Sequence, residues 1–150
     1  MIKEAMIENF NRDLNKLKEE ISLYKDESSL WIIKDGISNS AGNLCLHLIG
    51  NLNHFIGSVL GNTNYIRNRE NEFSAKNILR SELYKEIDKT IAVVSKSLKN
   101  LSDEDFEKEF PILIRNEKVK TDFMLLHLIA HFSYHLGQIN YHRRLTNNQI

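Results

Sequence analysis

Four of the six histidines in the sequence lie within one stretch, residues 121–144. His127, His131 and His135 are spaced four residues apart, and His142 follows seven residues after His135. In a helix, side chains at this spacing share a face, and neighbouring Cβ atoms lie about 5–6 Å apart. Two such imidazoles can bind one metal ion, but histidine pairs at this spacing also occur on ordinary surface helices. The pattern therefore indicates a metal site only if another segment supplies a further ligand.

A second candidate segment, residues 40–60, supplies that ligand. It carries His47 and, seven residues later, His54, about 10 Å further along a helix on the same face. Together with His131 and His135, His47 would provide three neutral imidazoles, which suit several divalent metals. Three protein ligands also leave coordination positions open for water or a substrate. We therefore predict a divalent metal site at His47, His131 and His135, with zinc or nickel favoured and iron or manganese as alternatives.

Polar residues near His47 have two interpretations each. Asn51 lies one helical turn after His47, where its amide can orient the imidazole ring; capping a buried backbone group is the alternative. Arg67 and Arg69 lie in the polar stretch 61–77, and they can bind an anionic ligand group. Alternatively, these arginines form a solvated surface with the acidic residues beside them.

Composition excludes several classes of protein. Lys+Arg 20 balance Asp+Glu 20, so the chain lacks the net positive charge of a general nucleic-acid binder. A single cysteine, Cys45, excludes an intrachain disulfide and favours the reducing cytoplasm. No apolar run approaches the roughly 20 residues that a membrane helix needs, and no secretory leader pattern follows Met1. We expect a cytoplasmic protein with neither nucleic-acid nor membrane partners.

Apolar residues recur at helical spacing in four long segments. The predicted helices span residues 2–24, 40–60, 80–100 and 121–144. Amphipathic helices must bury their apolar faces, and four of them do so most simply as a bundle. With no internal repeat or linker, the sequence predicts an all-α four-helix bundle that forms a single domain over residues 1–150.

The connections between these helices have their own signatures. Trp31, in the first connection, is expected to be a packing anchor. The stretch 61–77 is the longest loop, and Ser81 is a candidate cap for the helix after it. Ser102 begins a capping-box pattern for a short helical turn. Residues 110–119 are predicted to be extended, with a small hairpin as a possible arrangement.

The segments NSAGNLCLHLIGNL (residues 39–52) and HFSYHLGQI (residues 131–139) resemble the DinB/YfiT-like superfamily, and more narrowly one bacterial branch of it. The resemblance covers nearly the whole chain in helix order. It implies a four-helix bundle, a histidine triad that binds metal, and a homodimer. The matching positions place His47, His131 and His135 as ligands. His54 and His127 match no ligand position, and their roles, like that of His142, are left open.

The same resemblance implies an activity. Members of the superfamily include metal-dependent S-transferases that use low-molecular-weight thiols such as bacillithiol, and a mycothiol-dependent isomerase. We therefore expect a metal-dependent transferase that joins a bacillithiol-like thiol to a small electrophile. There are two alternatives. One is a metal-dependent hydrolase, and the other is a non-catalytic module that binds a metal or a small ligand. Tyr134, Tyr141 and the loop acids are candidate bases. Cys45 lies about 200° around the helix from His47, which argues against a role as ligand or nucleophile.

Overall fold

The computed structural model describes residues 2–147, and this part of the chain is all-helical. Its helices are α1 (Ile2–Ser22), the 3₁₀ turn η1 (Glu27–Trp31), α2 (Ala41–Leu52), the π-helix η2 (Asn53–Leu60), α3 (Arg69–Ser74), α4 (Arg80–Lys99), α5 (Asp103–Glu107) and α6 (Thr121–Asn147). The four long helical segments fall where the periodicity predicts them. Across residues 2–147, no helix combines the length and apolar character that a membrane span requires.

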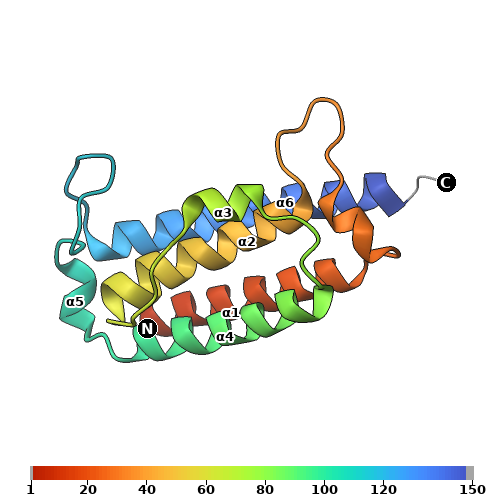
Figure 1. The fold of residues 1–150 in the computed structure, drawn as a ribbon. Helices are drawn as coiled ribbons and strands as arrows, with labels where there is room; N and C mark the ends of the chain where they lie inside the picture. The colour runs from red at the N-terminus through yellow and green to blue at the C-terminus, as the bar shows by residue number, and fades with distance from the viewer. Residues whose placement is uncertain (1, 148–150) are drawn as a thin grey trace.

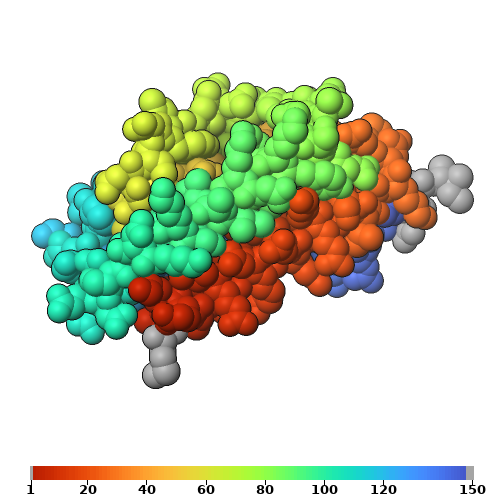
Figure 2. Space-filling view, turned by 90° about the horizontal axis from the view of Figure 1, so that it is seen from below, coloured from red at the N-terminus to blue at the C-terminus, as the bar shows by residue number. Residues whose placement is uncertain are grey.

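The long helices pack against one another in two layers (Figure 1). α2 and α6 lie above α1 and α4, and the short α3 covers the outer side of α2. Figure 2, seen from below, shows α1 and α4 side by side across the opposite face. The pair that carries the candidate ligands, α2 and α6, therefore lies together in one layer.

Burial follows the predicted apolar stripes. The core takes one stripe from each long helix, including Phe10 and Leu14 of α1 and Leu83 and Ile87 of α4. α6 differs, because it buries one apolar face and exposes a second. The exposed apolar side chains of α6 are Phe123, Leu126, Tyr134, Tyr141 and Leu145.

Serine hydroxyls cap the N-terminal ends of two helices. The Ser40 hydroxyl accepts a hydrogen bond from the Asn43 amide at the start of α2. Ser102 and Asp105 form the predicted capping box at α5. By contrast, α4 begins after Leu79 without a side-chain cap, so the assignment of Ser81 as a cap is wrong.

The second long segment changes from α-helix to π-helix at Asn53. The buried Asn53 amide donates to the Ile49 carbonyl and to the Thr90 hydroxyl of α4, and so ties this point to the neighbouring helix. Apolar periodicity did not predict the change. A π-helix has a wider turn than an α-helix. The change comes one residue before His54, and His47 and His54 still line the same cavity.

The connection before α2 packs as predicted. Trp31 is buried in the core, and its indole lies directly against Gly42. A Cβ at Gly42 would lie 2.7 Å from the ring, so only glycine allows this close approach.

The stretch 61–77 is not a continuous irregular loop. Residues 69–74 form α3, which begins where the Asn68 side chain accepts a hydrogen bond from the Asn71 amide. The helix has 6 residues, too few for apolar periodicity to reveal. This short helix brings the loop back across α2.

Residues 110–119 adopt the hairpin arrangement without forming a regular strand within the described chain. Ile114 and Glu117 exchange two backbone hydrogen bonds of 2.9 Å. Between them, Arg115 and Asn116 have φ of 49° and 64°. Two successive positive φ values are typical of a tight hairpin turn that matches strand twist. The hairpin projects beside the start of α6 (Figure 1).

Candidate metal centre

The structure brings the three predicted ligands together from two helices. His47 of α2 lies beside His131 and His135 of α6, and one ligand atom from each lies within 4.8 Å of the others. The Nε2 atoms of His47 and His131 are 3.1 Å apart. Two nitrogens that bind one ion at about 2.0–2.1 Å are roughly 3.0–3.4 Å apart. The separation of these two nitrogens therefore fits a shared metal ion.

Two of the rings are oriented by hydrogen bonds at their outer nitrogens. His47 Nδ1 lies 3.1 Å from Glu72 Oε1, and His135 Nδ1 lies 2.7 Å from Gln138 Oε1. Carboxylate and amide oxygens only accept hydrogen bonds, so both contacts favour a proton on Nδ1; the Arg67 Nη2 donor also lies 3.3 Å from His47 Nδ1. With the proton on Nδ1, the Nε2 lone pairs of His47 and His135 are free to bind a metal.

The His131 ring contacts both other ligand rings, with its centroid 5.0 Å from that of His47 and 4.6 Å from that of His135. Burial lowers the pKa of His131 to about 4, and the neighbouring histidines and Arg67 add to the effect. Burial also lowers the pKa of His135. Both rings are consequently neutral at physiological pH, and neutral imidazole is the form that binds metals. The Nδ1 atom of His131 is buried and has no hydrogen-bond partner in the described chain.

Glu72 supports the site from α3. Arg67 binds both of its carboxylate oxygens, with Nε–Oε2 of 2.8 Å and Nη2–Oε1 of 2.9 Å. Burial raises the pKa of Glu72, but hydrogen bonds from His47 and Arg67 outweigh it, so the net pKa is lowered and the carboxyl is ionised. Gly50 faces this carboxylate closely enough that a Cβ would collide with it. The glycine leaves the space in which Glu72 reaches His47.

The outer partner of His47 differs from the one that the sequence suggested. The Asn51 side chain is buried near the site, but it makes no hydrogen bond to His47, and its Oδ1 lacks any partner among the described residues. Glu72 takes the role instead. Arg67 and Glu72 form an ion pair with little exposure, not part of a solvated surface.

The remaining histidines have separate environments. His127 is exposed, and its ring centroid lies 6.4 Å from that of His131, outside the group of three. His54 is partly buried, and burial lowers its pKa. His142 is buried, where Nδ1 lies 2.6 Å from the Tyr24 hydroxyl and Nε2 donates to the Ile32 carbonyl at 2.8 Å. His142 therefore joins α6 to two points of the first connection, between α1 and α2.

The candidate base and thiol residues are not arranged for chemistry at the cluster. The Tyr134 ring lies 5.4 Å from that of His135, but Tyr134 is largely exposed. Cys45 is fully buried in the core, and burial raises the pKa of its thiol to about 12. A thiol with that pKa stays protonated and unreactive.

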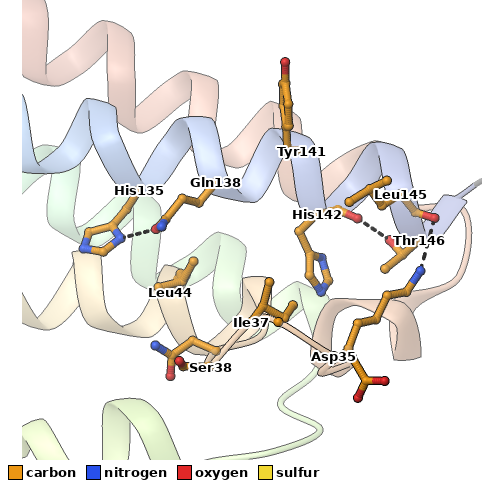
Figure 3. Close-up of a pocket in the computed structure, with 13 residues that line it drawn as sticks. Asp35, Ile37, Ser38, Leu44, His135, Gln138, Tyr141, His142, Leu145 and Thr146 are labelled. Carbon is orange, nitrogen blue, oxygen red and sulfur yellow. Dashed lines mark hydrogen bonds between the residues drawn. The ribbon is translucent and has the colours of Figure 1, made fainter.

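Two cavities flank the histidines along α6. The first, the apolar cavity, has a volume of about 520 Å³ and lies between α6 and residues 34–39 (Figure 3). His135 and Gln138 lie at one end of it, and Ile37, Leu44 and Leu145 line it further along. The apolar cavity thus adjoins one ligand of the candidate site.

The second cavity, the arginine cavity, has a volume of about 410 Å³ and lies on the N-terminal side of the histidines on α6. It is lined by His47, Asn51, His54, Phe55, Arg67, Arg69, Ile112, Leu113, Ile114, Arg115, Met124, His127, Leu128 and His131. His47 and His131 belong both to this lining and to the group of three. The histidines therefore lie between two cavities of different polarity.

Comparison with known proteins places the chain in a family. Residues 2–150 match the family described as Protein of unknown function (DUF1572). The chain belongs to this family. No curated protein matches it. The description of DUF1572 assigns no activity, so support for a function of this DUF1572 chain comes from the geometry of its site.

Sequence reasoning did not assign two residues that orient the ligands. Gln138 follows His135 by three residues on one helix, a spacing at which side chains meet, so this contact was visible in the sequence. Glu72 is 25 residues from His47, and their contact depends on the return of α3 across α2. No periodic signal in the sequence indicates that contact.

Proposed function

We propose that the chain is a DinB-like four-helix bundle whose three histidines bind a divalent metal, and that it transfers a low-molecular-weight thiol to a small electrophile. The observation that carries the proposal is the convergence of His47, His131 and His135, with two outer nitrogens held by hydrogen-bond acceptors. Such acceptors fix the tautomer that binds metal and raise the basicity of the ligand. Imidazole ligands favour zinc or nickel, with iron or manganese as alternatives.

The donor set supports a reactive site more than a closed structural one. Structural zinc sites usually have four protein ligands, whereas three leave a position for a reactant. When bound, a divalent ion supplies Lewis acidity that lowers the pKa of a thiol at that position. Glu72 and Gln138 hold their rings in place, and the apolar cavity beside His135 provides a partly enclosed space for a small apolar electrophile.

The proposed transfer conserves atoms and charge. The thiol releases its proton to solvent, and its sulfur forms a bond to the electrophilic carbon. The leaving group, such as chloride, departs with the electron pair of its bond to that carbon. With an epoxide, the carbon–oxygen bond opens and the oxygen takes up a proton.

The decisive assay compares zinc-loaded and metal-free protein with bacillithiol and a chlorinated or epoxide acceptor. The proposal predicts loss of thiol and formation of the S-conjugate at a rate well above that of metal-free protein and of zinc-loaded buffer. Turnover of an ester or amide without thiol would instead select a hydrolase. Tight metal binding with no turnover of any of these compounds would select a non-catalytic binding module.

We further propose that the chain forms a homodimer through α6. Phe123, Leu126, Tyr134, Tyr141 and Leu145 are all more than half exposed, with relative exposures of 61%, 54%, 67%, 66% and 62%. At about 100° per residue, these positions fall within one arc of roughly 100° on the helix. A continuous exposed apolar stripe of this kind is typical of an interface. Because the stripe runs the length of one helix, a second copy can pack the same stripe against it about a two-fold axis.

A further inference from the structure

The arginine cavity carries an unusual set of charges for a space beside a metal site. Arg67, Arg69 and Arg115 line it, and none of the described residues that line it is acidic. The overall chain is neutral, with Lys+Arg 20 and Asp+Glu 20, so this concentration of positive charge is local. A cavity lined by one sign of charge attracts ligands of the opposite sign.

Only one of these three guanidinium groups is neutralised by a protein carboxylate. Arg67 forms the ion pair with Glu72, whereas neither Arg69 nor Arg115 makes an ion pair within residues 2–147. Arg69 stacks on the Phe73 ring, with its Cζ 5.5 Å from the centroid. Arg115 lies in the tight turn of the hairpin. Two separate segments thus direct an uncompensated cation toward the same space.

The buried Asn51 side chain also lines the arginine cavity. It is 7% exposed, and its Oδ1 has no hydrogen-bond partner in the described part of the chain. Because that oxygen is itself buried, it lies behind the surface that an occupant contacts. The arginines therefore select the occupant by its charge.

We propose that the arginine cavity binds an anionic small molecule that carries a carboxylate or phosphate group. Arg69 and Arg115 bind the anionic group. The cavity shares His47 and His131 with the candidate metal site, whereas the apolar cavity adjoins His135 on the other side. The anion therefore lies beside the metal ligands, opposite the space for the apolar reactant. That this anion is the thiol reactant rests on the proposed function. That the cavity binds an anion does not.

The test uses calorimetric titration of the full chain with succinate and with inorganic phosphate, in metal-free and in zinc-loaded protein. Neutral succinamide is the matched probe without charge. The proposal predicts that at least one of the two anions binds the metal-free protein. Succinamide should bind far more weakly than succinate, and added salt should weaken the binding of the anion. The double variant Arg69→Gln/Arg115→Gln should bind about tenfold or more weakly.

Arg144→Gln is the control, because Arg144 is exposed on α6 and does not line the arginine cavity. It should leave anion binding unchanged. Arg69 and Arg115 are also exposed, so the double variant should fold, and circular dichroism with zinc stoichiometry checks this. Failure of both anions to bind metal-free protein, or equal binding by the double variant, would overturn the proposal. Zinc stoichiometry and thiol transfer are measured separately, so either can survive that result.

Discussion

Replacing Glu72 with Gln tests whether the carboxylate orients His47 for metal binding. The substitution keeps the size of the side chain but removes the charge that favours a proton on His47 Nδ1. A glutamine can also rotate its amide NH₂ toward Nδ1, and the ring proton then moves to Nε2, the nitrogen that must bind the metal. The 3.1 Å contact between Nδ1 and Oε1 is the interaction under test.

The expected magnitude follows from the type of contact. Loss of a hydrogen-bond partner behind a metal ligand typically lowers metal affinity about 10–100-fold. That range corresponds to about 1.4–2.8 kcal/mol of binding free energy. The variant should also lose stability without metal, because Arg67 is only 13% exposed and loses its charged partner. Since glutamine still accepts hydrogen bonds from Arg67, we expect less than the roughly 3–5 kcal/mol of a fully broken buried pair.

The assay is a competition titration of zinc against a chromophoric chelator, with urea unfolding of the metal-free protein alongside. Glu70→Gln is the matched control, because Glu70 is exposed on the same short helix and lies outside the ion pair. It should change zinc affinity by less than a factor of about two. If Glu72→Gln folds and binds zinc as tightly as the Glu70 variant, the role of the carboxylate is refuted.

Three further predictions concern other parts of the structure. Gly50→Ala should lower zinc affinity about tenfold, because the new Cβ displaces the carboxylate behind His47. Gly137→Ala, with nothing within 4 Å of its Cβ, should instead keep zinc affinity and stabilise α6 by about 0.5–1 kcal/mol; equal zinc affinities of the two variants would contradict this. Phe123→Glu should weaken the affinity of the two copies for each other by on the order of tenfold or more, as measured by sedimentation velocity. Ile66→Glu is the control, because Ile66 is 90% exposed and lies outside α6; it should leave the dimer unchanged. Burial lowers the pKa of His142 below its ordinary value of 6.5. Because the unfolded chain takes up this proton first, stability should fall as pH drops below about 6.5; urea unfolding at pH 7.5 and 5.5 should show this, with a smaller pH effect in His142→Gln.

Periodicity was sufficient to predict the long helices and the shared face of the α6 histidines. The apolar stripe through Phe10 and Leu14 and the four-residue step from His131 to His135 are local patterns that a helix converts directly into shared faces. The convergence of His47 with this pair required two segments to pack in one layer. The family-like motifs supplied that placement, and the structure has the same arrangement.

The features that sequence could not supply depend on contacts between distant segments. α3 is too short to show a period, so the return of Glu72 to His47 was hidden. The π-helix begins at Asn53, whose buried amide bonds across to Thr90 of α4. Likewise, nothing in the spacing of His142 reveals that its ring bonds Tyr24 and the Ile32 carbonyl, which makes it a core residue.

Zinc titration of untagged, metal-free protein tests the central claim most directly. The account predicts one ion per chain for the wild type, loss of stoichiometric binding in His131→Ala, and retained binding in His127→Ala, one turn earlier on α6. No stoichiometric binding by the wild type, or loss in His127→Ala with retention in His131→Ala, would contradict the assignment of the three ligands.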